Sequence, residues 1–387
     1  MTTLSNVVPD AVKIAPTTVY VATNGTSVAP YHTLETAATN VADAIAALGL
    51  PSDGSRARVI VADGVHPAPG NRQTIALPIE IIGNDADPSA VTFDGSGNRA
   101  FFYLNHGQAY VHGVTFYNGY APNGSTTDAP NYYHGAFEVG AGLASNCVFS
   151  ANHGWLGPVV IWNEGRIVDS LFDGNENDNS NGEQAGQGGA LKTAGNAVCR
   201  GCTFTNNTAY WGGAVAIAGG TVDKCRFFGN KAKSAYGGGV FQKGGVLKNS
   251  LFVGNTAVTA GGGLRLVDGK TVNCTLVSNA LSNATLQDVS MTGGKFLNSI
   301  GLFRSATGGD FDHSFTGTDP LFRNPAAGDY RLLRTSPCVN AGSWMHLGDT
   351  RREVRSQTDL IGVCRLLGHD VDMGCCETIS GFVIIAR

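Results

Sequence analysis

A glycine-rich motif recurs at a fixed interval through the middle of the chain, and no other feature constrains the fold as strongly. Two glycines followed by a small residue and an aliphatic residue occur four times, 24 or 25 residues apart. The four copies are Gly188–Leu191, Gly212–Val215, Gly237–Val240 and Gly261–Leu264. A repeat of this kind indicates one structural unit that stacks on copies of itself.

A second motif, Cys/Ser-x-Phe/Leu-x-x-Asn, runs in phase with the glycine pairs. Its copies are Cys147–Asn152, Ser170–Asn175, Cys202–Asn207, Cys225–Asn230, Ser250–Asn255 and Cys274–Asn279. We expect the asparagines to form a ladder of side-chain amides at one corner, where Asn also tolerates a left-handed backbone. We expect the Cys and Ser side chains to be small buried groups, with the cysteines as free thiols.

The residues after each glycine pair alternate with period two, which indicates a strand buried on one face. The aliphatic residue points one way, and the next residue, which is Lys192, Ala216, Phe241 or Arg265, points the other way. A period near 24 residues is too short for a propeller blade, and it lacks the helices of ankyrin or tetratricopeptide repeats. Each period therefore predicts one turn of a parallel β-helix, stacked at ~4.8 Å per coil.

The repeat divides the chain into three parts. Residues 57–305 are expected to form roughly ten coils of an all-β solenoid. Residues 1–56 are expected to hold an N-terminal strand and a capping helix over Thr33–Leu48, with Thr33 as its N-cap. Residues 306–387 lose the period and predict an irregular C-terminal cap. The cap holds Cys338, Cys364, Cys375 and Cys376, and their pairing stays open.

The two motifs over residues 135–300 resemble the repeats of chlamydial polymorphic outer membrane proteins and of bacterial secreted right-handed parallel β-helix proteins. Segments near the ends are similar to the caps of that set: Val19–Ala22, Pro30–Thr33, Val59–Gly64, Asp319–Phe322, Gly328–Leu332 and Ser336–Gly342. The last three often precede a surface-anchoring or sorting signal there. The resemblance implies a right-handed solenoid on the cell surface or outside the cell. The fold itself hosts lyases, hydrolases, epimerases and adhesins.

Composition narrows the classes of partner. With 26 Lys and Arg against 30 Asp and Glu, the net charge of −4 argues against a nucleic-acid binder. No apolar run approaches the ~18 residues of a membrane span. The first residues lack a basic stretch followed by an apolar one, so we expect either a removed export signal or another export route. The sequence gives no indication of an oligomeric state.

The outward row of the first strand is the candidate site. Extending the register through Gly135 adds Glu138 to Lys192, Phe241 and Arg265, with Lys243 and Trp162 beside the row. The expected substrate-binding residues are Tyr133, His134, Trp155, Trp162, Tyr210, Trp211, Tyr236 and Phe241. Flat rings suit stacking on sugars, and cations suit an anionic polysaccharide. The alternative is an ordinary solenoid surface with some exposed cations and rings.

Three activities remain open for such a surface. A lyase acting by β-elimination would use Lys192 as base and Arg265 as charge neutraliser, although three coils (~14 Å) separate them. Lys243 and Arg265 lie on adjacent coils and make a tighter pair. A glycoside hydrolase would use two carboxylates from neighbouring coils, Glu138 and Glu164. A non-catalytic adhesin or glycan-binding passenger needs neither set.

One coil is longer than the rest, because Ser170 and Cys202 lie 32 residues apart. The extra residues include Asp173, Glu176, Asp178 and Glu183, whose oxygens are ligands of the kind that Ca²⁺ takes. The spacing does not match an EF-hand loop. We expect either a calcium site or a solvated polar loop here, and we expect no other cofactor.

Overall fold

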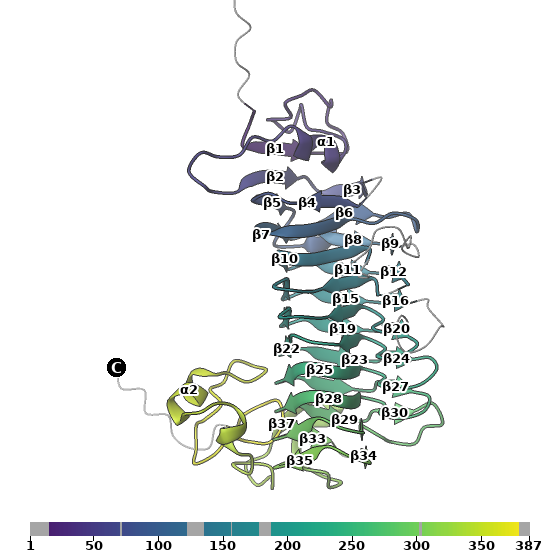
Figure 1. Ribbon diagram of the computed structural model, residues 1–387, viewed down its shortest axis with the longest axis vertical. Coiled ribbons are helices and arrows are strands. Elements are labelled where there is room, and N and C mark those ends of the chain that lie inside the picture. Colours follow the sequence, from purple (N-terminus) through teal and green to yellow (C-terminus); the bar gives the residue numbers. More distant parts are fainter. Residues whose placement is uncertain are drawn as a thin grey trace, which may run out of the picture.

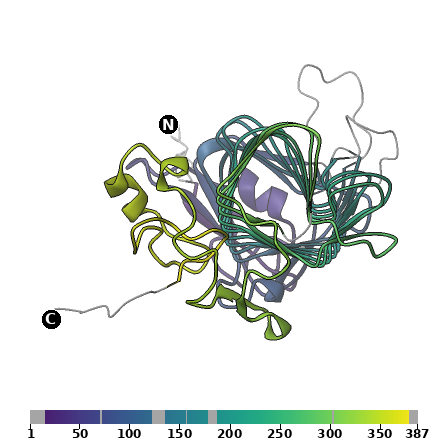
Figure 2. The same ribbon diagram turned by 90° about the horizontal axis from the view of Figure 1, so that it is seen from below.

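The strands form a long stack of coils, and the C-terminal segment packs against one side of the last coils (Figure 1). The computed structural model describes residues 15–69, 72–121, 135–155, 157–177, 187–301 and 304–378. Seen along the stack, successive coils superpose on one outline with the C-terminal segment beside them (Figure 2). The main sheets pair in parallel, so the prediction of a right-handed parallel β-helix is confirmed. No helix of the described residues is long and apolar enough to cross a membrane.

The coils contribute strands to three sheets, A, B and C, although the coils of β3, β6 and β33 have no sheet C strand among the described residues. Sheet A comes first after the glycine pairs and has two halves, A1 and A2. Half A1 holds β4 (Gln73–Ile75), β7 (Phe102–His112), β10 (Phe137–Ser145), β13 (Val159–Ile161), β17 (Leu191–Thr193), β21 (Val215–Ile217), β25 (Val240–Lys248), β28 (Leu264–Val272), β31 (Val289–Met291) and β34 (Arg304–Ala306). The long strands β7, β10, β25 and β28 continue into half A2. The other A2 strands are β1 (Thr18–Val21), β2 (Ala57–Val61), β5 (Ile79–Ile82), β14 (Arg166–Val168), β18 (Val198–Arg200), β22 (Thr221–Asp223), β32 (Lys295–Leu297) and β35 (Asp310–Asp312).

Sheets B and C follow in the same order in each coil. Sheet B holds β3 (Gly64–Pro67), β6 (Val91–Asp94), β8 (Thr115–Tyr117), β11 (Val148–Ser150), β15 (Leu171–Asp173), β19 (Thr203–Thr205), β23 (Arg226–Phe228), β26 (Leu251–Val253), β29 (Thr275–Val277) and β33 (Ile300–Gly301). Sheet C holds β9 (Tyr120–Ala121), β12 (His153–Gly154), β16 (Glu176–Asn177), β20 (Thr208–Ala209), β24 (Lys231–Ala232), β27 (Thr256–Ala257) and β30 (Ala280–Leu281). Parallel pairing begins at β1 and continues to β35, whereas the sequence pattern indicates coils over 57–305.

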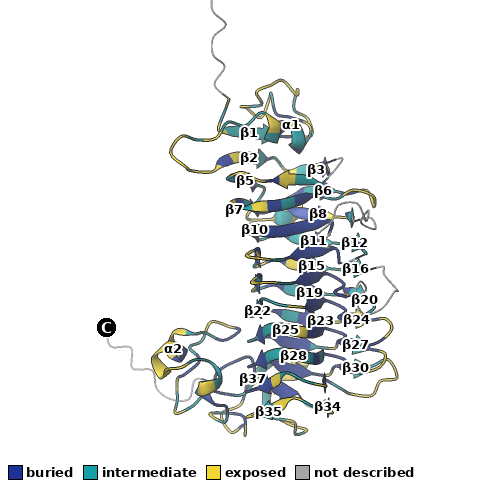
Figure 3. Cartoon of the chain, in the orientation of Figure 1, coloured by how far each residue is buried: buried dark blue, intermediate teal, exposed yellow. Residues whose placement is uncertain are grey.

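The core runs the length of the stack because each coil places the same side chain over its neighbour's. Sheet B supplies a column of buried rings, Phe149, Phe172, Phe204, Phe227 and Phe252, with successive centroids 4.8, 4.6, 5.0 and 4.3 Å apart. Offset stacking adds to the free energy of burying these rings. Buried residues follow the strands, and exposed ones gather in the turns and the C-terminal segment (Figure 3).

The predicted asparagine ladder is present at the corner between sheets B and C. In each coil the Asn Oδ1 accepts bonds from the backbone N–H and the Nδ2 of the preceding Asn, as Asn230 does for Asn207 at 3.0 and 2.9 Å. Asn279 ends the ladder by donating to Asp288. The left-handed conformation falls on the residue before each ladder Asn, such as Asn206, and not on the Asn itself. The chain turns one residue earlier than expected, which leaves the amide pointing into the stack.

The cysteines of the repeat are buried as predicted. Ser170 Oγ accepts from the N–H of Cys147, and Ser250 Oγ does the same for Cys225. All nine cysteines lie within the described ranges, and all are free thiols, including the four near the C-terminus.

The N-terminal helix is shorter than predicted. Helix α1 spans Val41–Ala46, and its N-cap is Asn40, whose side chain accepts from the N–H of Asp43 at 2.9 Å. Thr33 instead closes a turn with Thr36. Ala38 cannot join a helix because its backbone pairs with β1, donating to the carbonyl of Tyr20 at 3.0 Å.

The buried side chain of Arg365 links the C-terminal segment to the coils. It contains a strand pair, β36 (Phe322–Asn324) and β37 (Asp329–Leu332), the short helix η3 (Trp344–His346) and helix α2 (Arg351–Ser356). Arg365 is fully buried and donates to Asn249 Oδ1 through Nε and Nη2, at 3.0 and 2.7 Å. Its Nη1 donates to Glu377 at 3.0 Å. A buried charge needs hydrogen-bonding partners, and Arg365 has them both in the coils and in the C-terminal segment.

The ladder gives a direct test of what holds the coils in register. Asn230→Ala removes one hydrogen bond from each of three groups: the Asn207 N–H, the Phe204 carbonyl and Asn255 Oδ1. We expect a loss of about 3 kcal/mol in the free energy of unfolding, measured by urea titration. The exposed turn residue Asn196 is the matched control, and Asn196→Ala is expected to change stability by less than about 0.5 kcal/mol. Equal losses in both variants would show that the ladder does not stabilise the stack.

Candidate functional site

The structure places the predicted outward row on half A1. Register pairing aligns Glu138, Lys192, Phe241 and Arg265 on one line across the coils. The coils between and around them contribute Tyr103, Val160, Ala216 and Ser290 to the same line. Three coil steps separate Lys192 from Arg265, as the repeat spacing predicts.

Six of the predicted residues meet in what we call the ring–cation cluster. Its members are Tyr210, Trp211, Tyr236, Phe241, Lys243 and Arg265. The Trp211 ring lies edge-on to Phe241 and to Tyr236, with centroids 4.9 and 5.5 Å apart. Lys243 Nζ lies 5.4 Å from the Phe241 centroid, and the Arg265 guanidinium lies 4.8 Å from that of Tyr236. Cations over ring faces are attracted by the ring quadrupole.

The cluster carries positive charge with few acceptors. Among the described residues, neither Lys243 nor Arg265 forms an ion pair, and Arg265 Nη1 donates to Ser290 Oγ at 2.7 Å. Trp211 Nε1 and Arg265 Nε are buried donors for which the described part of the chain offers no acceptor. Burial lowers the pKa of Arg265. Unsatisfied buried donors are rare in folded proteins and call for an explanation.

Lys192 lies further along the same row and is only 8% exposed. Burial lowers the pKa of its amine, and the charge of Lys243 lowers it further. A lysine with a lowered pKa holds a larger fraction of neutral amine near neutral pH. The two lysines therefore influence each other electrostatically, although two coil steps separate their strands.

Glu138 belongs to a different group at the upper end of the row. Its side chain is 2% exposed, forms an ion pair with Arg72 and accepts from the Gly135 N–H at 2.9 Å. The Arg72 guanidinium lies 5.4 Å from the Tyr103 ring, and that ring stacks on Trp162 at 6.1 Å. Trp162 is thus part of this group and not of the ring–cation cluster. Arg72 and Tyr103 were not predicted, because their coils lack the glycine pair that sets the register.

Glu164 lies in the turn between β13 and β14, where it is exposed. It lines a cavity of about 330 Å³ together with Arg166 and Asn196. Glu138 is in an ion pair with Arg72, whereas Glu164 lines the cavity of about 330 Å³. This arrangement does not support the hypothesis of a glycoside hydrolase that uses the two carboxylates as a pair.

The remaining predicted residues are dispersed or lie outside the described ranges. Tyr133, His134, Asp178 and Glu183 are outside them, and Trp155 is half-buried directly after β12. Asp173 accepts from Thr205 and Asn206 on the outside of sheet B, at 2.6 and 3.0 Å. Glu176 forms an ion pair with Lys233. The calcium site stays a prediction.

A second region with charged side chains of both signs lies between half A2 and the C-terminal segment. A cavity of about 780 Å³ has five charged or titratable residues in its lining: Asp268, Lys270, Lys295, Asp310 and His346. Lys270 and Lys295 are paired in register on adjacent coils. Burial lowers the pKa of Lys270, and Lys295 and Lys248 add to this effect. This region was not predicted from the sequence, although the 25-residue spacing of Lys270 and Lys295 places them in phase with the repeat.

One coil is similar to a known repeat family. Residues 201–218, from β19 to β21, match the Chlamydia polymorphic membrane protein repeat, as the sequence motifs predict. The solved structure of pectate lyase Pel9A is similar over 93% of this chain and 96% of that chain, with 14% identity and a TM-score of 0.48. No curated protein matches the sequence significantly. The chain is a parallel β-helix repeat protein, and a likeness as distant as that to Pel9A says nothing of activity.

The coupling of the two lysines is testable. In Lys243→Ala the pKa of Lys192 is expected to rise, because the neighbouring positive charge that disfavours protonation is gone. The pH dependence of acetylation of Lys192 by acetic anhydride, read by peptide mass spectrometry, reports this change. Lys233→Ala is the control, because Lys233 pairs with Glu176. An unchanged profile in Lys243→Ala, or an equal change in the control, would contradict the coupling.

Proposed function

We propose that the protein binds an anionic polysaccharide outside the cell or at its surface, through the ring–cation cluster. The observation that carries this proposal is the pair of cations, Lys243 and Arg265, which lie over rings with no carboxylate partner among the described residues. A uronate or sulfate group supplies the missing negative charge, and charge-assisted bonds of this kind are the stronger ones.

The rings explain why the ligand is a sugar polymer and not a small anion. Tyr210 and Tyr236 are half-buried at the edge of the cluster, so part of each ring remains accessible for stacking on a pyranose. Donors in the cluster also suit sugar hydroxyl and carboxylate oxygens. The cavity beside the C-terminal segment has carboxylates beside its lysines and no Phe, Tyr or Trp in its lining, so it fits this ligand less well.

Binding is measured by affinity electrophoresis and calorimetry with polygalacturonate, alginate and chondroitin sulfate, and with a neutral glucan for comparison. Lys243→Ala and Arg265→Ala are each expected to weaken binding to an anionic glycan by about 10- to 150-fold, because each removes a charge-assisted contact of about 1.5–3 kcal/mol. Added salt is expected to weaken binding by the wild-type chain.

The matched control is Arg334→Ala, because Arg334 is an exposed arginine of the C-terminal segment. Its affinity is expected to equal that of the wild type. Retention of full affinity in both cluster variants, or equal binding of the neutral glucan, would refute the proposed site. Absence of binding to every glycan favours a structural or adhesive passenger.

We further propose that, if the bound glycan is a uronan, Lys192 is the base of a β-elimination: its amine takes the proton beside the carboxylate, a C=C bond forms as the bond to the glycosidic oxygen breaks, and water protonates that leaving oxygen. Its lowered pKa is the observation that favours this activity, because a base works best with a pKa near the operating pH. Lys243 would neutralise the uronate carboxylate, since its charge is the one that acts on Lys192. Arg265 lies three coils from Lys192 and would bind the polymer further along.

The test of catalysis follows the ultraviolet absorbance of the unsaturated product. The rate is expected to rise with pH as Lys192 loses its proton, and Lys192→Ala is expected to abolish it while glycan binding persists. Lys192→Arg keeps the charge but cannot serve as a base, so it is expected to be inactive too. An active Lys192→Arg variant would remove the assignment, and a flat trace with every uronan would make the protein a binder only.

A further inference from the structure

The last coil departs from the repeat at the corner between half A2 and sheet B. In three preceding coils the residue with a left-handed backbone at this corner is an asparagine: Asn249, Asn273 or Asn298. In the last coil it is His313, with φ +43°, and the residue before it is Asp312. An imidazole preceded by a carboxylate therefore occupies this corner in the last coil, in place of the asparagine of the three coils before it.

A second imidazole is brought to this corner by contacts that do not involve Asp312. The Ser343 N–H donates to Asn298 Oδ1 at 2.8 Å, and Asn298 Nδ2 donates to the Ser343 carbonyl at 2.9 Å. Three residues later, Lys270 donates to the carbonyl of His346. The backbone at Ser343 and at His346 is thus bound to side chains of half A2 and its corner, and these contacts bring His346 to the corner.

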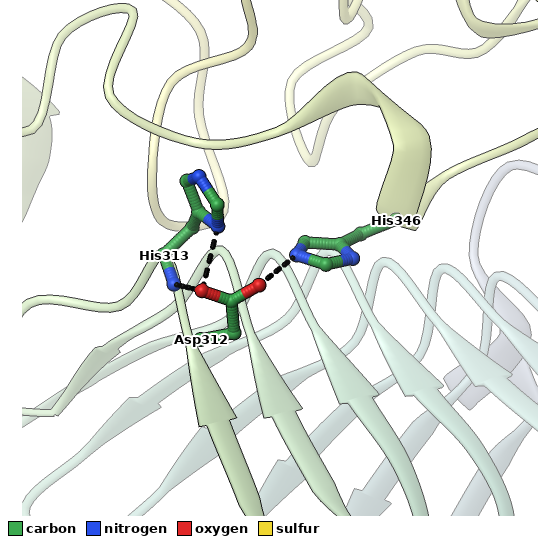
Figure 4. A group of neighbouring side chains, drawn as sticks. All are labelled: Asp312, His313 and His346. Atoms are coloured by element: carbon green, nitrogen blue, oxygen red, sulfur yellow. Dashed lines mark hydrogen bonds and ion pairs between the residues drawn. The ribbon is translucent and has the colours of Figure 1, made fainter.

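The three side chains face one another (Figure 4). Asp312 Oδ1 lies 2.8 Å from His313 Nδ1, and Asp312 Oδ2 lies 3.0 Å from His346 Nε2. All three candidate ligand atoms lie within 4.8 Å of one another. No other group of three such side chains in the described part of the chain is this close.

From this geometry we infer that Asp312, His313 and His346 form a binding site for a divalent metal of the Zn²⁺ type. Donors bound to Zn²⁺ at about 2.0–2.2 Å lie at most about 4 Å apart, so small side-chain rotations suffice. Two imidazole nitrogens with one carboxylate suit Zn²⁺, whereas Ca²⁺ takes oxygen ligands.

The metal would join the last coil to the C-terminal segment, because Asp312 and His313 belong to the stack and His346 belongs to η3. Three protein ligands leave a coordination position for water or an anion. His346 also lines the cavity of about 780 Å³ that opens beside half A2, so a water molecule or a small anion from that cavity can complete the coordination.

The experiment uses the full chain after treatment with a chelator. Zn²⁺ titration by calorimetry is expected to show one equivalent bound, with a rise in melting temperature. Co²⁺ is expected to give weak visible bands without the strong near-ultraviolet absorption of thiolate ligation. His313→Gln and His346→Gln are each expected to lower the Zn²⁺ affinity by more than about tenfold, which even loss of an outer-shell partner can cost.

The exposed His369 is the matched control, and His369→Gln is expected to bind Zn²⁺ as the wild type does. His313 lies on the surface, so its variant tests the site even if His346→Gln disturbs the C-terminal segment; the melting temperature without metal checks this. Absence of Zn²⁺ uptake, unchanged affinity in His313→Gln, or a thiolate band that places the metal on a cysteine would each overturn the inference.

Discussion

The hydrogen-bonded register between neighbouring coils is the constraint on which the rest of the structure depends. The asparagine ladder fixes it inside the stack, because each amide binds both the backbone and the side chain of the coil before it. Because the register places equivalent positions of neighbouring coils over one another, it also aligns the Phe column, the buried Cys and Ser groups and the outward row. A coil that slipped by one residue would turn its buried strand faces outward.

The sequence predicts the solenoid well because periodicity and burial act together in it. The glycine pairs and asparagines repeat at one interval, so the strands and the row through Lys192 and Arg265 follow from counting. Helix α1 was predicted too long because an amphipathic stripe does not show that Ala38 pairs with a strand. The fastening by Arg365 was missed as well, since its partner Asn249 is distant in the chain.

Some residues of the candidate site could be predicted from the sequence, and others could not. The ring–cation cluster was within reach of the sequence because its members recur in phase with the glycine pairs. The group around Glu138 and Arg72 was not, since Arg72 lies in a coil without that motif. Asp312, His313 and His346 were also beyond reach, because two of them interrupt the repeat and the third comes from the irregular segment. The repeat predicts residues that occupy the same position in every coil. The group at the end of the stack depends on contacts that, in the described part of the chain, occur in the last coil alone, so the repeat does not predict it.

Each coil adds the same rise to the stack, so the length of the molecule changes in equal steps. Adding or removing one whole coil between β21 and β25 would keep every ladder contact and would move the lower surface by ~4.8 Å relative to the upper one. Duplication of a unit of about two dozen residues is thus a tolerated way for such a chain to grow. Its reach along an extended partner can change in fixed steps while its cross-section stays the same.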